Sequence, residues 1–158
     1  MTLQEKLLER YGNPLTNQKE FEDKWLTYWD IPLNINTHIP ALPNKLYCNI
    51  DAIEVFEKWF QEMINHGVYK EIKTFDGCFN PRYIRGSKTK ISNHAFGLAI
   101  DFNASQNKLG YTRKELTDMG LKPFSEAFIM IAENCHIKCG ANYKARPDLM
   151  HFEFIQHL

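Results

Sequence analysis

Two short segments constrain this chain more than any other part of it. The first, SNHAFGLAID, spans residues 92–101, and the second, DLMHFE, spans residues 148–153. Together they supply two imidazoles and a carboxylate that could bind one metal ion, with another carboxylate three residues before the last imidazole. A zinc enzyme needs three protein ligands, an open fourth position for water and a nearby base. The pattern therefore indicates a zinc-dependent hydrolase.

Alternation of residue types predicts that two of the candidate ligands share one face of a sheet. In residues 98–103 every second side chain is apolar, as in a half-buried strand, so Asp101 faces away from the core. In residues 151–154 His151 and Glu153 share the face opposite the two phenylalanines. If both strands lie in one sheet over one core, Asp101 and His151 emerge on the same side.

The third candidate ligand, His94, lies in the loop before the first of these strands. Gly97 allows the chain to turn, so the loop can bring the His94 ring back over Asp101. Taken singly, the three residues would be a loop histidine, a turn or cap residue and a strand histidine. Their shared side and the acid at Asp148 favour a metal site instead. The remaining histidines are not accompanied by other candidate ligands and are expected at the surface or at caps: His38, His66, His136 and His157.

Length and composition favour one α+β domain. A chain of 158 residues with 44% hydrophobic content can bury a core without disulfides, and its helical and strand patterns follow no regular βαβ order. The 19 basic and 19 acidic residues balance, so nothing points to nucleic acid or a membrane. No apolar run approaches the roughly 20 residues of a membrane span. We expect an N-terminal helical region over about 1–45 and a motif-bearing core over about 46–158.

Periodicity and turn residues predict the main elements. The first ten residues form an amphipathic helix with a Thr2–Glu5 capping box, and a longer helix runs from a cap at Asp51 to His66. A polar, basic loop over residues 78–93 leads to His94. The other expected segments are a helical aromatic stripe at 20–29, irregular structure at 31–45, a strand at 68–75, a strand at 98–103, a short helical turn within 104–122, a helix at 124–134 and a strand at 150–155.

The four cysteines are interpreted as free, partly buried thiols. Cys135 and Cys139 are four residues apart, which is not the spacing of a zinc ribbon, and there is no second close pair. The N-terminus lacks the apolar centre of a signal peptide, and a chain without export keeps its thiols reduced. The alternative is a closed structural zinc site formed by Cys135, His136 and Cys139.

The paired motifs resemble a known family of zinc peptidases. Ser-x-His-x-x-Gly-x-Ala-x-Asp followed by Asp-x-x-His-Phe-Glu is similar to the signature of the D-alanyl-D-alanine carboxypeptidase / L-alanyl-D-glutamate endopeptidase group. The same fold includes D-Ala-D-Ala dipeptidases and the Hedgehog signalling domain. Specific matches run over about residues 79–107 and 147–154. The resemblance implies a small antiparallel sheet that carries the zinc site, with helices packed on its other face.

The resemblance also implies roles for individual residues. His94, Asp101 and His151 look like the Zn2+ ligands, and Asp148 matches the catalytic base, a position where the family often has glutamate. Arg82 looks like the arginine that stabilises the oxyanion, and Arg85 is the alternative.

Three further positions bear on the expected substrate groove. Ser92 matches a residue that contacts substrate, with capping of the His94 loop as an equal alternative. Glu153, which shares the face of His151, is expected to orient a ligand imidazole or a loop. Where the family commonly has Trp-Gly-Gly, this chain has residues 138–140 as Lys-Cys-Gly, so the groove wall departs from the family pattern there.

The implied substrate is the stem peptide of bacterial peptidoglycan, cleaved between L-Ala and D-Glu. Aspartate at position 148, the short chain and the missing export signal resemble phage endolysins. We therefore expect a bacteriolytic monomer that is made in the cytoplasm and acts on the cell wall after release.

Three alternatives remain at this point. One is a D-alanyl-D-alanine carboxypeptidase or dipeptidase. Another is a Hedgehog-like module in which zinc stabilises a binding surface, although the presence of both Asp148 and Arg82 argues against it. The third is a phage-tail or bacterial remodelling enzyme with the same chemistry.

Overall fold

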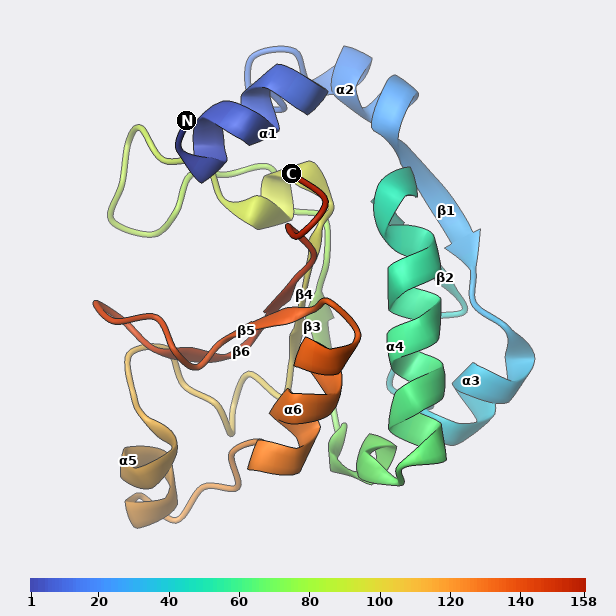
Figure 1. Cartoon of the computed structure of the whole chain (residues 1–158), viewed down its shortest axis with the longest axis vertical. Helices are drawn as coiled ribbons and strands as arrows, with labels where there is room; N and C mark the ends of the chain where they lie inside the picture. Colours follow the sequence, from blue (N-terminus) through green and yellow to red (C-terminus); the bar gives the residue numbers. More distant parts are fainter.

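A computed structural model describes all 158 residues, which form helices around two antiparallel sheets (Figure 1). The elements in chain order are α1 (Leu3–Tyr11), α2 (Gln18–Trp25), β1 (Leu26–Asp30), α3 (Leu33–His38), β2 (Lys45–Asn49), the 3₁₀ turn η1 (Ile50–Ala52), α4 (Ile53–Asn65), η2 (Val68–Glu71), β3 (Phe75–Gly77), η3 (Asn93–Phe96), β4 (Ala99–Phe102), α5 (Arg113–Asp118), α6 (Glu126–Asn134), β5 (Lys138–Gly140) and β6 (Asp148–Glu153).

The central sheet has four strands in the order β3-β4-β6-β5, and every neighbouring pair is antiparallel. Strands β4 and β6 lie in the middle, where Ile100 is opposite Phe152 and Asp101 is opposite His151. Side chains directly opposite each other have Cβ atoms about 4.5–5.5 Å apart. This register therefore places Asp101 and His151 next to each other on one face.

Helices α4 and α6 cover the other face of this sheet (Figure 1). Trp59 of α4 is fully buried between them. Its ring centroid lies 5.8 Å from that of Phe102 in β4, 5.3 Å from that of Phe152 in β6 and 6.5 Å from that of Phe128 in α6. The apolar sides of both central strands thus pack on the helices, which leaves the polar sides free to form a site.

Strands β1 and β2 form a separate two-stranded sheet that is joined to the site region through Asn49. The Asn49 backbone N–H donates to the carbonyl of Gly97 (3.0 Å), and its side-chain amide donates to the carbonyl of Phe96 (2.9 Å). Gly97 has a φ of 68°, and a Cβ there would lie 2.7 Å from Leu26 Cδ2 and 2.9 Å from the Asn49 nitrogen. Both the backbone conformation and the space therefore require glycine at this turn.

The structure confirms the predicted α+β class, with its small antiparallel sheet and packed helices, and several of the predicted elements. Helix α1 begins with the expected capping box, in which the side chains of Thr2 and Glu5 each accept a hydrogen bond from the other's backbone N–H. Helices α4, α5 and α6 and strand β4 lie within the predicted segments. Strand β6 begins at Asp148 rather than at Met150.

The predicted strand over residues 68–75 is wrong. Gly67 takes a left-handed conformation and is followed by η2, so that β3 begins only at Phe75. The alternation of apolar side chains there reflects a single 3₁₀ turn. Residues 31–45 are not wholly irregular, because they contain α3. The aromatic stripe is also not one helix, since α2 ends at Trp25 and Tyr28 lies on β1 with 66% of its surface exposed.

The cap of the long helical segment is Asn49, not Asp51. The Asn49 side chain accepts a hydrogen bond from the Asp51 backbone N–H (2.9 Å), which begins η1 ahead of α4. The Asp51 carboxylate instead accepts hydrogen bonds from Arg10 and Tyr11 of α1.

All four cysteines are free, as predicted, and they are buried rather than partly buried: Cys48, Cys78, Cys135 and Cys139. Burial raises the pKa of Cys48 and of Cys139 to about 12, so both remain thiols at neutral pH. The alternative zinc site does not form, because the ligand atoms of Cys135, His136 and Cys139 do not converge.

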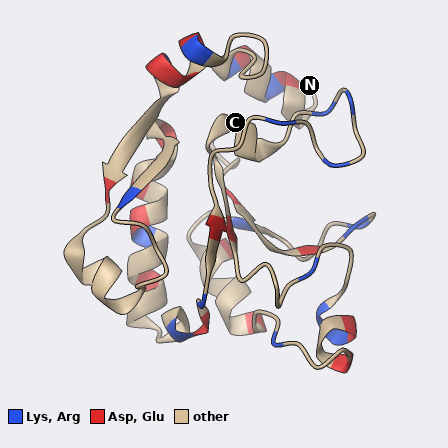
Figure 2. Cartoon of the chain, turned by 180° about the vertical axis from the view of Figure 1, so that it is seen from behind, with Lys and Arg blue, Asp and Glu red and all other residues tan.

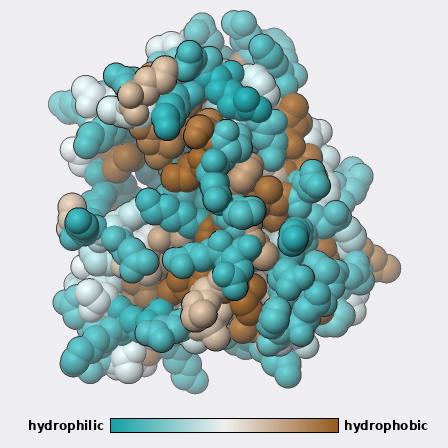
Figure 3. All heavy atoms as spheres, in the orientation of Figure 1, coloured by the Kyte–Doolittle hydropathy of each residue, from teal (hydrophilic) through white to brown (hydrophobic).

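The surface is mixed in character. No helix in the structure has the length and apolar composition needed to cross a bilayer. Hydrophobic atoms are scattered among hydrophilic ones on the face seen in Figure 3, and the outline is indented at the left, between two projecting loops that Figure 1 shows in the same place.

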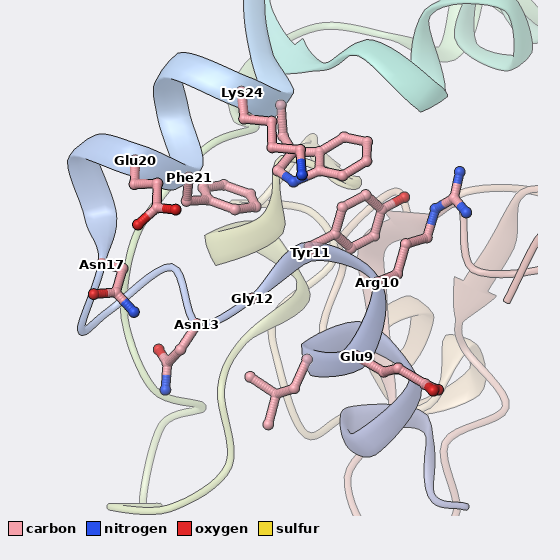
Figure 4. Close-up of a pocket in the computed structure, with 11 residues that line it drawn as sticks. Glu9, Arg10, Tyr11, Gly12, Asn13, Asn17, Glu20, Phe21 and Lys24 are labelled. Carbon is pink, nitrogen blue, oxygen red and sulfur yellow. The ribbon is translucent and has the colours of Figure 1, made fainter.

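Tyr11, the last residue of α1, contacts His157 near the C-terminus. The hydroxyl donates to Asp51 Oδ2 (2.7 Å), and its oxygen lies 2.6 Å from His157 Nε2. Because the single hydroxyl hydrogen goes to the carboxylate, the imidazole carries its hydrogen on Nε2 and donates it to the tyrosine. Figure 4 shows Tyr11 beside Arg10 at a pocket of about 260 Å³ between α1 and α2.

His157 is therefore not the surface or capping residue that the sequence predicted. Its Nδ1 atom is buried without a hydrogen-bond partner, and burial lowers the pKa of the ring. The neutral form is favoured, because a second N–H would have no acceptor.

The packing of Trp59 predicts a large effect on stability. Trp59→Ala should lower the free energy of unfolding by about 3–5 kcal/mol, since it removes the side chain that joins both helices to the sheet. Met130→Ala, on the exposed side of α6 (60% exposed), should change it by less than about 0.5 kcal/mol. Urea unfolding measures both, and similar losses in the two variants would contradict this account of the core.

The state of His157 predicts a pH dependence of stability. The folded pKa is lowered, so the unfolded chain takes up a proton first and stability falls as the pH drops below about 6.5. Urea unfolding at about pH 7.5 and 5.5 should show a smaller loss for His157→Gln than for the wild type. The control is His66→Gln, an exposed histidine that should leave the wild-type loss unchanged. Equal losses in all three proteins would show that His157 is not the titrating group.

Candidate active site

His94 is held by its own loop in one orientation. Ser92 caps the turn η3, and its hydroxyl accepts a hydrogen bond from the His94 backbone N–H (3.2 Å). The ring Nδ1 lies 2.7 Å from the carbonyl oxygen of Cys78. A carbonyl can only accept, so the ring hydrogen is on Nδ1 and Nε2 presents a lone pair. Capping is therefore the role that the structure gives to the Ser92 hydroxyl.

His151 is oriented in the same way by Glu153. The ring Nε2 lies 3.0 Å from Glu153 Oε1, and the other carboxylate oxygen accepts a hydrogen bond from the Asn93 side-chain amide. Glu153 is only 1% exposed, so these two partners satisfy a carboxylate that water does not reach. The ring hydrogen is directed at Glu153, which leaves the lone pair of His151 Nδ1 facing the site.

Three donor atoms converge at one point between β4, β6 and η3. His94 Nε2 lies 3.1 Å from Asp101 Oδ1 and 3.2 Å from His151 Nδ1, and His151 Nδ1 lies 3.4 Å from Asp101 Oδ1. Two of these atoms are imidazole lone pairs and the third is a carboxylate oxygen, so no hydrogen is placed to join them. Ligand atoms around one tetrahedral zinc ion lie roughly 3.3 Å apart. The donor set and its spacing therefore fit a zinc ion.

The charges of the cluster favour a cation. Burial acts to lower the pKa of His94, but the adjacent Asp101 carboxylate outweighs burial and leaves that pKa above its usual value. Burial also acts to raise the pKa of Asp101, but the adjacent imidazoles of His151 and His94 outweigh it and hold that pKa well below its usual range. Asp101 is thus a carboxylate at any physiological pH, and it attracts positive charge to this point.

Asp148 lies in the same cleft and has an unsatisfied oxygen. It begins β6, three residues before His151, and its Oδ1 atom is buried without a hydrogen-bond partner. Burial raises the pKa of Asp148 above that of an ordinary aspartate. A carboxylate with a free lone pair and a raised pKa is suited to accept a proton from water.

Gly140 in β5 allows this placement, and sequence reasoning missed it. A Cβ at Gly140 would lie 2.5 Å from the Asp148 carbonyl oxygen and 3.0 Å from the Asp148 Cβ. Only glycine lets β5 approach β6 this closely, at the irregular step in their pairing. The glycine was noted in the sequence as the last residue of Lys-Cys-Gly, where the family commonly has Trp-Gly-Gly, but strand β5 itself was not predicted.

The cleft around these residues has a volume of about 480 Å³ and opens between two loops. One loop precedes η3 and carries Arg82 and Arg85, and the other joins β5 to β6. Figure 2 shows Lys and Arg segments on both loops, at the right, and acidic segments on the strands between them. Arg82 and Arg85 both line the cleft, and the charge of Arg82 acts on His94.

Sequence reasoning also missed two partners that hold the histidines. Asn93 is adjacent to His94, but its bond to Glu153 depends on how η3 packs beside β6. The Cys78 contact comes from a backbone carbonyl, which no residue type signals.

The geometry predicts a metal stoichiometry. The purified protein should bind one zinc ion per chain, and His151→Ala should lose it because one of three donors is removed. Glu153→Gln should weaken zinc binding by about 10–100-fold, since it disturbs the partner that orients His151. Metal analysis after dialysis and titration with a competing chelator measure these effects. His66→Ala, at an exposed histidine, is the control, and full zinc binding by His151→Ala would contradict the site.

Comparison with known proteins gives one match. Residues 85–154 match the profile of a protein family described as D-alanyl-D-alanine carboxypeptidase. The match covers less than half of the chain, and it contains the three convergent donors and Asp148 but not Arg82. No curated protein and no solved structure matches the chain. Over this segment the chain is similar to a family of peptidases, which supports a hydrolase that acts on peptides.

Proposed function

We propose that this chain is a zinc-dependent peptidase that cleaves the stem peptide of bacterial peptidoglycan between L-Ala and D-Glu. One observation carries the proposal: two imidazole nitrogens and a carboxylate oxygen converge in a cleft beside Asp148, whose Oδ1 atom is buried with no hydrogen-bond partner. The three converging atoms provide the ligands that a catalytic zinc site needs, and the free oxygen of Asp148 provides a base.

His94, Asp101 and His151 would hold the ion. Zinc bound in such a site lowers the pKa of water to about 7 and polarises a carbonyl group. Asp148 accepts the proton of the attacking water through its free Oδ1 and then delivers that proton to the leaving amine. Its raised pKa suits both transfers, because the group must accept a proton and release it again.

An arginine of the cleft stabilises the scissile carbonyl oxygen as it becomes negative. Arg82 is favoured over Arg85, because its charge reaches His94 and its side chain is less exposed. Its backbone carbonyl accepts a hydrogen bond from the Ser92 N–H (3.0 Å), which fixes Arg82 beside the turn that carries His94. A donor of this kind contributes on the order of 100-fold or more to the rate.

The choice of bond rests on Asp148. In the peptidase group that the motifs resemble, aspartate at this position is associated with endopeptidase members. We propose the setting of a phage endolysin, in which the enzyme reaches the bacterial wall at lysis. The matched family description favours a second candidate, removal of the terminal D-Ala by a carboxypeptidase.

The mechanism predicts that Asp148→Ala separates zinc binding from turnover. The variant should keep its zinc and lose about 10²–10⁴-fold in hydrolysis rate, since a general base is removed and no ligand is lost. Digestion of purified peptidoglycan, with mass spectrometry of the new termini, measures the rate and identifies the bond. New N-terminal D-Glu supports the endopeptidase, and released D-Ala supports the carboxypeptidase.

Two controls complete this experiment. Asp118→Ala removes an exposed carboxylate of α5 and should leave the activity unchanged. Chelation of the wild-type protein should abolish hydrolysis, and added zinc should restore it. A zinc-loaded wild-type protein with no hydrolysis of any peptidoglycan would instead favour the binding-module alternative, and a fully active Asp148→Ala would remove Asp148 from the mechanism.

A further inference from the structure

The mouth of the cleft carries four cations that have no carboxylate partner. The cations that line it are Arg82, Arg85, Lys90 and Arg146. The structure contains nine ion pairs within 4.0 Å, and none of them involves any of these four residues. Other basic residues of the chain are also in no ion pair, but these four share one cleft with the candidate active site.

Two of the three carboxylates of the cleft are engaged deeper down, and the third forms no ion pair with these cations. Asp101 faces the two histidines, Glu153 accepts from His151 and Asn93, and Asp148 is half-buried at the start of β6. The cleft therefore has an acidic floor, where a zinc ion would be bound, and a basic mouth. Figure 2 shows the same division, with red segments on the central strands and blue segments on the two loops.

The loop that carries Arg85 and Lys90 is braced by backbone and side-chain contacts. Tyr83 pairs with Ile91 across the loop, and the Ile84 N–H donates to the Lys90 carbonyl (2.8 Å). Gln4 of α1 accepts from the Ile91 N–H (2.8 Å) and donates to the Thr89 carbonyl (3.2 Å). These contacts hold the cations over the cleft.

Arg146 connects the two loops across the mouth. Its Nη2 donates to the carbonyl oxygen of Arg85 (3.1 Å), while its own loop is held by a hydrogen bond from the Gly110 N–H to the Pro147 carbonyl (2.8 Å). A guanidinium has five N–H donors, so most of those on Arg146 remain free.

We propose that Arg85, Lys90 and Arg146 form a carboxylate-binding subsite, so that the cleft selects an acidic peptide with a free carboxylate next to the scissile bond. This inference rests on the proposed function and names the form of its substrate. Guanidinium groups bind carboxylates through paired, charge-assisted hydrogen bonds that a neutral amide cannot replace. The enzyme should therefore distinguish a stem peptide with a free D-Glu α-carboxylate from one in which that group is an amide. A polyanion fits less well, because the acidic floor would repel it and the cleft of about 480 Å³ admits only a short segment.

The experiment measures how fast the zinc-loaded protein cleaves two synthetic stem peptides. One peptide has the free α-carboxylate on D-Glu, and the other has an amide in its place. The free carboxylate should give a kcat/KM at least about tenfold higher. Arg146→Gln and Lys90→Gln should each reduce this preference, mainly through a higher KM for the acidic peptide. Lys144→Gln and Lys88→Gln are the matched controls, because each removes a charge from the same loop without lining the cleft. The preference should weaken as salt is raised, since exposed charges are screened.

Binding of the same peptides to zinc-loaded Asp148→Ala, measured by calorimetry, separates this inference from the proposed function. Tighter binding of the acidic peptide supports the subsite even if the wild type cleaves neither peptide, in which case only the proposed function fails. Equal cleavage and equal binding of the two peptides would overturn the subsite and leave the peptidase standing. A preference that survives in both Arg146→Gln and Lys90→Gln would also overturn it, as would a preference for a phosphate polymer over the acidic peptide in competition.

Discussion

The pairing of β4 with β6 is the constraint on which the candidate site depends. Antiparallel alignment places Asp101 directly opposite His151, and side chains in such a position are neighbours without any help from loops. A slip of one residue would turn every side chain of one strand to the opposite face, so that an apolar residue would enter the site and a charged one the core. The apolar partners Ile100 and Phe152 prevent this slip because both are buried in the core.

The core and the site are therefore two faces of one sheet. Trp59 fills the space between the helices and the apolar face, and this packing fixes the strands whose polar face carries the donors. The donors are then oriented from behind: Glu153 directs His151, and the Cys78 carbonyl directs His94. Such outer partners determine which ring nitrogen is free to bind a metal ion.

The sign of the charge changes from the mouth of the cleft to its floor. Asp101 and the other acids form its floor, and unpaired cations on two loops form its mouth. An anion that enters the cleft therefore passes these cations first and reaches Asp148 only at the floor. Electrostatic interactions are stronger where little water is present. The Oδ1 atom of Asp148, which is buried without a hydrogen-bond partner, can therefore interact strongly with a group that enters the cleft.

The sequence alone determined the residue types of the candidate site, the sheet faces of Asp101 and His151, and the class of fold. Alternation along β4 and β6 is a local property of the chain, and local periodicity is what a sequence displays directly. Prediction from the sequence failed where the tertiary structure overrode the local pattern. This happened at η2 beside Gly67, in the aromatic segment that divides between α2 and β1, and at the Asn49 cap. The tertiary structure alone decided the Cys78 carbonyl contact, the close approach at Gly140 and the position of Arg146 across the mouth. These features depend on how distant segments meet in space, and contacts of that kind leave no periodic trace in the chain.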